Sequence, residues 1–262
     1  MNSAGPAPGA AEGLSVRPVC TDGTPEEQWQ RWLQERAPWP PLELDVERLV
    51  VLGAHPDDEV LGAGGIMASA AVAGIEVVVV CMSDGSGSHP GSRTLTPEQL
   101  ATRRHVELET ATALLGLATP RWFGLRDGGL TEQAHTMAGI VDAVLDDGPD
   151  VATGLLSVWS RDGHPDHDAV GRCAIEVARR RRLPLWMYPI WMWHWAAPGD
   201  SSVPWDRVRV QRLDPEVLAV KHAAIRSFDT QINPLSPDPA DAAILPPHVL
   251  AHLTRPWEFV IV

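Results

Sequence analysis

The sequence predicts an α/β domain of the Rossmann-like type, with a mainly parallel sheet and helices on both faces. Short apolar runs alternate along the chain with longer segments of helical periodicity, and this alternation is typical of repeated strand–helix–strand units. The strand-like runs are continuously apolar, as expected for strands that are buried on both faces. The length of 262 residues allows one large domain.

The N-terminal part of the chain is predicted to lie outside this domain. Residues 1–15 are rich in Ala, Gly and Pro and are expected to be a flexible tail, because they have little apolar surface to bury. Residues 16–47 are predicted to form an N-terminal helical extension. Its helix should begin at residues 24–27, with Thr24 as the N-cap and Glu27 completing a capping box. Three prolines at positions 38, 40 and 41 should end this helix.

A single domain is predicted for residues 48–262. Its first half should contain a strand at 48–54, a helix from Val60, a strand at 75–82 and a helix at 96–116. That last helix carries a capping-box signal at residues 96–99. The polar loop 83–90 between the second strand and this helix is expected to border a functional site.

The second half continues the same alternation. We expect a strand at 121–123, a helix at 131–145, a strand at 151–158 and a helix that ends near Arg182. The aromatic run 185–195 is predicted to be a strand at an edge or a bulge, because Pro189 removes a ladder donor. Residues 257–262 are expected to form the final strand.

Charged and polar residues gather where the first predicted strand ends. Residues 54–59 are Ala-His-Pro-Asp-Asp-Glu, placed between the apolar run 49–52 and the next helix. Loops beyond the carboxyl ends of parallel strands carry ligand sites, and His55 and Asp58 are donors that zinc accepts. The plainer alternative is that the carboxylates only stabilise the start of the helix.

A second stretch favours the metal site over that alternative. Residues 164–167 are His-Pro-Asp-His, and they also follow a strand-like run and precede a helical segment. Two His/Asp loops at equivalent strand ends indicate one shared site. Glycines follow the first loop at positions 62, 64 and 65, but a dinucleotide loop is disfavoured because the preceding carboxylates would repel a pyrophosphate. Close packing of the helix on the sheet is the better explanation of these glycines.

Together the two motifs resemble those of the PIG-L-type (LmbE-like) de-N-acetylase family, whose paired signatures are AHPDDE and HPDH. Both signatures match at every position. The predicted helix 96–116 also resembles the family pattern at Arg104, Glu107, Leu115 and Gly116. The resemblance extends over residues 48–262, although Phe228, Asp229 and Thr230 stand where His and Ser are usual in the family.

The resemblance implies a zinc-dependent hydrolase of an N-acyl amide on a small molecule, above all an N-acetylated amino sugar or its glycoside. It implies one zinc ion per chain, held by His55, Asp58 and His167, with Asp57 as the general base. His164 would act either as a cation that stabilises the oxyanion or as an acid toward the departing amine. Asp166 would fix the tautomer of His164 and hold it charged. Glu59 is expected to be structural or to support the metal loop.

Three further residues are predicted to reach the substrate. The resemblance assigns this role to Arg104 and Asp127, whereas the plain expectations are a solvated helical arginine and a turn-forming aspartate. His194 lies in the tryptophan-rich run 185–195, whose rings would either stack on the substrate or cap the core. An amidase acting on a larger conjugate and a metal-binding module without catalysis remain the alternatives. A two-metal phosphoesterase is disfavoured because the sequence offers too few additional ligands.

Composition limits the partners and the compartment. The net charge of −13 and the sequence pI of about 5.1 argue against nucleic acid and anionic membranes. No apolar run approaches the roughly 20 residues of a membrane span. Three scattered cysteines, Cys20, Cys81 and Cys173, fit no disulfide framework, so a reducing cytoplasm is expected. The sequence leaves open whether copies of the chain form a homo-oligomer.

Overall fold

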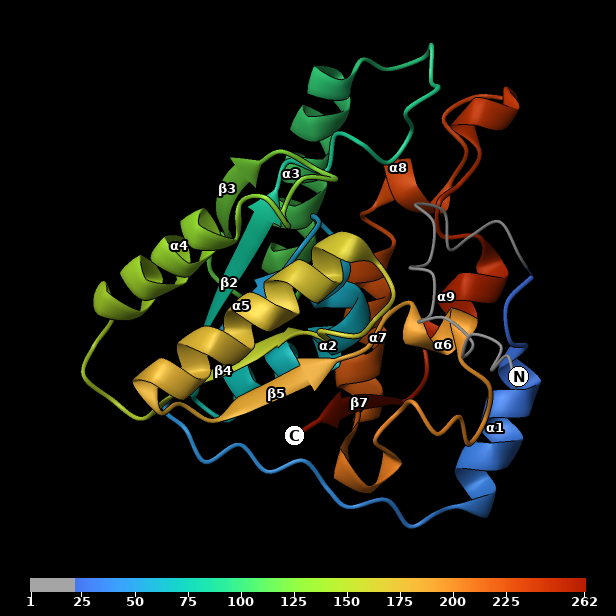
Figure 1. Cartoon of the computed structure of the whole chain (residues 1–262). Coiled ribbons are helices and arrows are strands. Elements are labelled where there is room, and N and C mark those ends of the chain that lie inside the picture. Colours follow the sequence, from blue (N-terminus) through green and yellow to red (C-terminus); the bar gives the residue numbers. More distant parts are fainter. Residues whose placement is uncertain (1–21) are drawn as a thin grey trace, which may run out of the picture.

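The structure, a computed structural model, describes residues 22–262, which contain a seven-stranded sheet with helices on both faces (Figure 1). The expected flexible tail at residues 1–15 lies outside the described residues. The strands are β1 (Arg48–Gly53), β2 (Glu76–Ser83), β3 (Arg121–Leu125), β4 (Thr153–Val158), β5 (Leu185–Tyr188), β6 (Val208–Arg212) and β7 (Trp257–Ile261).

The strand order in the sheet is β3-β2-β1-β4-β5-β7-β6. Strands β1 to β5 pair in parallel, and β7 is antiparallel to both β5 and β6. These pairings confirm the predicted mainly parallel α/β fold. The chain runs outward from β1 to β3 and then returns to β4 on the other side of β1, so the connections diverge between β1 and β4. In open α/β sheets, ligands bind at such a switch point, beyond the carboxyl ends of the strands.

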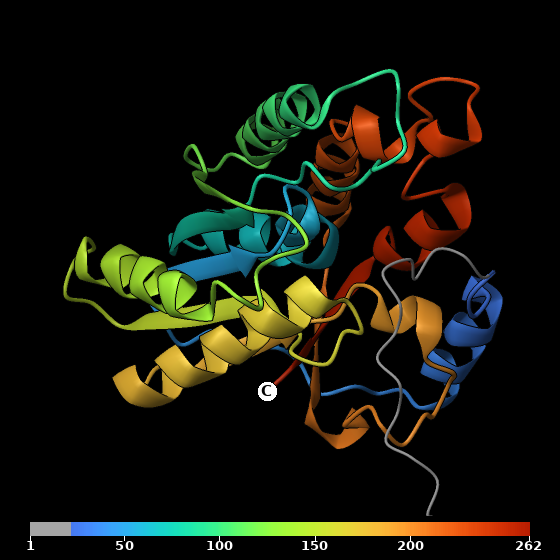
Figure 2. The same cartoon turned by 45° about the horizontal axis from the view of Figure 1, so that its top comes forward.

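Helices cover the two faces of the sheet. On one face lie α2 (Asp58–Val72) and α7 (Pro215–Ile225), with α3 (Pro97–Leu114) beside α7 (Figure 2). On the other face, α4 (Ala134–Asp146) packs against α5 (Pro165–Arg181), which crosses β1, β4 and β5. The capping box predicted for α3 is confirmed, because the Thr96 side chain accepts from the N–H of Gln99 and the Gln99 side chain from the N–H of Thr96.

Glycines allow α2 to lie unusually close to its neighbours. A Cβ added at Gly62 would lie 2.1 Å from the ring of Tyr188, and one at Gly65 would lie 2.4 Å from the side chain of Leu213. Neither residue can therefore carry a side chain without displacing a buried neighbour. The packing role predicted for these glycines is the one that the structure shows.

The N-terminal extension packs against segments from the C-terminal part of the chain, among them α9 (Pro247–Leu253). Its helix α1 (Glu26–Glu35) begins after Pro25, and the Thr24 hydroxyl donates to the carbonyl oxygen of Ala196 at 2.6 Å. The prediction that Thr24 caps this helix is wrong, because Pro25 occupies the N-cap position and no side chain accepts a helix N–H there. Trp29 is fully buried, and its indole N–H donates to the carbonyl oxygen of Trp193.

The aromatic run 185–195 is not one strand, which corrects the prediction. Strand β5 ends at Tyr188, and the short helix α6 (Met192–Trp195) follows it. Strand β5 also lies inside the sheet, between β4 and β7, rather than at an edge. Pro189 ends the strand without breaking a ladder, and the next three backbone N–H groups, of residues 190–192, donate to the carboxylate of Asp162. That carboxylate supplies the partners that the turn into α6 needs.

Short elements complete the C-terminal part: η2 (Trp205–Arg207), α8 (Asp229–Ile232), η3 (Pro239–Asp241) and α9 (Pro247–Leu253). None of the helices between residues 22 and 262 combines the length and the apolar character that a membrane crossing requires.

Candidate active site

The first motif forms the junction between β1 and α2. Asp57 is the N-cap residue of α2, and Asp58 lies in its first turn. The Oδ2 atom of Asp58 accepts the backbone N–H groups of Ala54 and His55, at 3.1 and 2.8 Å. This carboxylate therefore holds the loop that carries the His55 ring, and its Oδ1 atom faces the neighbouring motif.

The second motif forms the equivalent junction between β4 and α5. His164 is the N-cap residue of α5, and its Nδ1 atom accepts the backbone N–H of Asp166 at 3.2 Å. His167 lies in the first turn, and its Nδ1 atom is 2.8 Å from Oδ2 of Asp162. Because Asp162 is fully buried and accepts here, His167 is held with its Nε2 atom toward the first motif.

Side chains of three residues from the two motifs converge. The Nδ1 atom of His55 lies 3.2 Å from Nε2 of His167 and 3.4 Å from Oδ2 of Asp58. The Oδ1 atom of Asp58 lies 3.3 Å from the same Nε2 atom. Zinc bonds of about 2.0–2.1 Å place tetrahedral ligand atoms about 3.3–3.4 Å apart. These pairwise distances are compatible with a bound ion. Among the described residues, the groups whose donor atoms all lie within 4.8 Å of one another are His55, His164 and His167, and His55, Asp127 and Asp166.

The protonation of the two imidazoles reflects the carboxylates around them. Burial alone lowers the pKa of His55, but the charges of Asp127, Asp166 and Asp58 raise it well above its ordinary value. Burial likewise lowers the pKa of His167, and Asp58 and Asp162 raise it to about 9. The surrounding carboxylates thus favour positive charge at this point of the chain, as a cation site requires.

Asp57 lies beside these donors and is paired with Arg104. Its Oδ2 atom is 3.0 Å from Nη2 of Arg104, and both side chains are buried. The Nη1 atom of Arg104 donates to the carbonyl oxygen of Gly85 at 2.9 Å. Burial raises the pKa of Asp57, Arg104 lowers it and Asp58 raises it again, with a net upward shift. Arg104 is therefore at the site, but its described partners are the expected base and loop 83–90 rather than solvent.

Two more carboxylates lie on the opposite edge of the His55 ring. The Nε2 atom of His55 is 3.2 Å from Oδ1 of Asp127 and 3.4 Å from Oδ2 of Asp166. Asp127 also accepts the N–H of Gly87 at 2.8 Å, so loop 83–90 borders the site as predicted. These carboxylates orient His55 so that its Nδ1 atom faces the other donors.

Asp166 does not hydrogen-bond His164 through its carboxylate, although the charge of that carboxylate acts to raise the pKa of the ring. Its carboxylate accepts the backbone N–H groups of Gly128 and Leu130, at 2.7 and 3.1 Å, and only its own N–H contacts the imidazole of His164. The expectation that Asp166 holds His164 charged therefore needs correction. Burial and the neighbouring His55 and His167 lower the pKa of His164 to about 3.

His194 is placed differently from the other predicted site residues, which contact one another directly. Its ring packs 6.1 Å from the rings of both Trp191 and His248 and lies against the backbone of Gly23. Its carbonyl oxygen accepts the N–H of Thr24. The tryptophans around it extend into a buried cluster with α1, so capping of the core is the observed role of this segment. A contact of His194 with substrate stays a prediction.

The sequence did not predict the surroundings of two buried acidic residues, Asp162 and Glu59. Asp162 was missed, although an acidic residue five positions before a ligand-type histidine is a usable signal for a supporting carboxylate. Glu59 is fully buried, and neither carboxylate oxygen has a hydrogen-bond partner among the described residues. Burial and the charge of Asp58 raise the pKa of Glu59 well above its ordinary value.

The fold and this donor set define an α/β protein with a metal-type centre at the switch point of its sheet. A family model described as GlcNAc-PI de-N-acetylase matches residues 50–178, from β1 to α5, and contains both histidine motifs. Over these residues the chain is similar to the PIG-L family. It is 28% identical over 227 residues to the 1D-myo-inositol 2-acetamido-2-deoxy-alpha-D-glucopyranoside deacetylase of Rhodococcus opacus, with 76% of this chain and 72% of the relative covered.

Solved structures agree on the fold. The N,N'-diacetylchitobiose deacetylase from Pyrococcus horikoshii superposes with a TM-score of 0.55 and 24% identity, covering 70% of each chain. The A40926 pseudoaglycone deacetylase superposes with a TM-score of 0.61 and 23% identity, covering 83% of this chain and 97% of that chain. The comparisons confirm the predicted family and the predicted class of enzyme, the N-deacetylases.

Proposed function

We propose that this chain removes the acetyl group from an N-acetylated amino sugar or its glycoside, with one zinc ion held by His55, Asp58 and His167. The observation that carries the proposal is the meeting of His55 and His167, whose ring nitrogens are 3.2 Å apart, with the Asp58 carboxylate within 3.4 Å of both rings and the buried Asp57 beside them. The named relatives act on acetylated sugars, which supports the substrate class.

Zinc at this position would lower the pKa of a water molecule toward about 7 and polarise the amide carbonyl. Asp57 would take the proton from that water as the general base. Arg104, 3.0 Å from Asp57, would hold the carboxylate in the orientation for this transfer. The proton on Asp57 would then pass to the amine nitrogen as the C–N bond breaks, which leaves acetate and the free amino sugar.

The two roles left open for His164 can be weighed from its hydrogen bond. Its Nδ1 atom accepts the N–H of Asp166, so the proton of the neutral ring lies on Nε2. A cationic ring would lose this bond, because Nδ1 would then carry a hydrogen toward another donor. The geometry therefore supports a neutral His164 that donates from Nε2 to the developing oxyanion, rather than an acid toward the amine.

The size of the acyl group is proposed to be small. The side chains of His55, Asp57 and Asp58 expose only 10%, 8% and 4% of their surface. The relatives named above are deacetylases, which favours acetyl over the larger acyl groups of a conjugate. Asp127, at the outer side of His55, would contact the sugar. The cytoplasm is proposed as the compartment, because Cys81 and Cys173 are free thiols.

The decisive test combines metal analysis of the purified chain with hydrolysis of a panel of N-acetylated and longer N-acylated sugars, before and after chelation. We expect about one zinc per chain and chelator-sensitive release of acetate. A His167→Ala variant should lose both. Release of larger acids in preference to acetate would favour the amidase alternative. Absence of bound zinc, with no rescue by added zinc, would overturn the proposal.

A further inference from the structure

A carboxylate from the last strand contacts the middle of helix α2. The Oε1 and Oε2 atoms of Glu258 in β7 accept the backbone N–H groups of Gly65 and Ile66, at 2.8 and 2.7 Å. In an α-helix, N–H groups beyond the first turn bond to the carbonyl four residues back. Gly65 and Ile66 lie in the interior of α2, where no external acceptor is needed.

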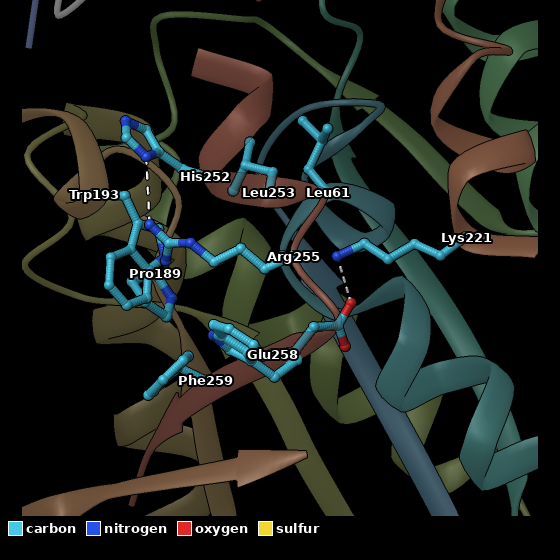
Figure 3. Close-up of a pocket in the computed structure, with 11 residues that line it drawn as sticks. Leu61, Pro189, Trp193, Lys221, His252, Leu253, Arg255, Glu258 and Phe259 are labelled. Atoms are coloured by element: carbon cyan, nitrogen blue, oxygen red, sulfur yellow. Dashed lines mark hydrogen bonds and ion pairs between the residues drawn. The ribbon is translucent and has the colours of Figure 1, made fainter. Parts of the chain in front are cut away.

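The charge of this carboxylate is balanced by Lys221, the one lysine of the sequence. Its Nζ atom, reaching from α7, lies 2.6 Å from Oε1 of Glu258, and the two side chains expose only 1% and 2% of their surface. Figure 3 shows the two side chains meeting beside α2. They border a cavity of about 10 Å³, which has room for about one water molecule. The pair is thus almost fully removed from solvent.

Buried ion pairs of this kind are rarely retained for stability alone, because desolvation offsets their attraction. This pair instead acts on the helix that presents Asp57 and Asp58. The hydrogen bonds from Gly65 and Ile66 to the carboxylate tie the middle of α2 to β7 and, through Lys221, to α7.

We propose that the Lys221–Glu258 pair is a positioning device for the metal site. By anchoring the middle of α2, it fixes the angle at which the start of the helix, with Asp57 and Asp58, meets His167. Without Glu258, α2 loses this anchor and Asp58 shifts relative to His167. The role of these residues in binding metal rests on the proposed function; the action of the pair on α2 does not.

The test uses the double variant Lys221→Met/Glu258→Met. Replacing a buried ion pair by apolar side chains of similar size usually preserves or increases stability, so this variant should fold with a melting temperature at or above that of the wild type. We expect its zinc affinity, measured by competition with a chromophoric chelator, to fall about 10-fold or more. Amide exchange of the segment 58–66 should become faster, because Gly65 and Ile66 lose their bonds to the carboxylate, whereas exchange in α5 should be unchanged.

Glu26→Gln is the matched control. Glu26, on α1, is another largely buried carboxylate, and it pairs with His252 of α9 and with Arg255. The variant should lower the melting temperature and leave the zinc affinity and the exchange of residues 58–66 unchanged. Equal zinc affinity in the double variant and the wild type would overturn the positioning role, as would an equal loss in Glu26→Gln. A wild type that binds no zinc would overturn the proposed function, yet altered exchange at 58–66 in the double variant alone would still support the action on α2.

Discussion

Opposing influences act on the carboxylate of Asp57. Burial and the adjacent Asp58 raise its pKa, while Arg104 lowers it, and the net shift is upward. A general base is most effective when its pKa approaches the working pH, because it is then both ionised and able to hold a proton. At the residue scale, the environment of Asp57 thus favours the role that the family resemblance implies.

Replacing Asp57 by Asn should separate metal binding from catalysis. The Asn side chain keeps the shape but cannot accept a proton, so we expect zinc to be retained and turnover to fall by about 10²- to 10⁴-fold. Metal analysis and acetate release from the same preparation measure the two effects. Normal turnover in this variant would contradict the assignment of the base.

Asp162 should matter for metal affinity although it is not among the expected ligands. Its carboxylate binds Nδ1 of His167 and three backbone N–H groups. In Asp162→Asn, the amide can no longer accept from all of them, so His167 loses its orientation. We expect zinc affinity to fall by about 10- to 100-fold, measured by chelator competition. Asp142→Asn on the surface of α4 is the control, and a similar loss there would contradict the role of Asp162.

At the scale of elements, the position of α2 depends on close approach to β5. The absent side chain of Gly62 leaves the space that the Tyr188 ring occupies. The Tyr188 hydroxyl in turn donates to the carbonyl oxygen of Leu52 at 2.8 Å, directly before the first motif. Tyr188 therefore both packs against α2 and supports the backbone that leads into residues 54–59.

Two glycine-to-alanine changes in helices should have opposite effects. Gly62→Ala forces a Cβ into the Tyr188 ring and should destabilise the fold by about 1–3 kcal/mol. A Cβ added at Gly139 of α4 would have no neighbouring atom within 4 Å, so Gly139→Ala should gain up to about 1 kcal/mol from helix propensity. Urea unfolding of both variants measures the difference. A stable Gly62→Ala protein would show that α2 can move away from β5.

At the scale of the whole molecule, residues far apart in the sequence are joined by buried charges. Glu26 of α1 is 2.7 Å from Nε of Arg255 and 2.6 Å from Nδ1 of His252. The Arg255 guanidinium also lies 4.2 Å from the centre of the Trp193 ring. The N-terminal extension is thus attached to α6 and to the end of the chain, outside the part that the family model matches.

This attachment should make stability depend on pH in the acid range. Burial alone would raise the pKa of Glu26. The hydrogen bonds and charges of Arg255 and His252 outweigh burial and bring this pKa down from 4.5 to about 2. Because the folded pKa is the lower one, the stabilisation is complete above about pH 4.5 and is lost as the pH falls toward about 2. Glu26→Gln should therefore cost about 1.5–3 kcal/mol at pH 7 and less at pH 3. Urea unfolding at both pH values checks this, and a pH-independent difference would contradict it.

Much of the site could be predicted from the sequence because its residues are local to two strand ends. The motifs 54–59 and 164–167 each follow an apolar strand, and parallel strands end at the same edge of a sheet. The sequence by itself therefore determined the fold class, the pair of motifs and the family that the chain resembles. It also determined the packing role of the glycines in α2.

Only the tertiary structure decided which partner each polar group takes. Thr24 leaves its own helix to donate to Ala196, and Asp166 binds the turn 128–130 instead of His164. Asp162 and Glu258 accept backbone N–H groups from segments about 30 and 190 positions away. Such contacts have no local sequence pattern, because burial brings together any donors and acceptors that would otherwise remain unpaired.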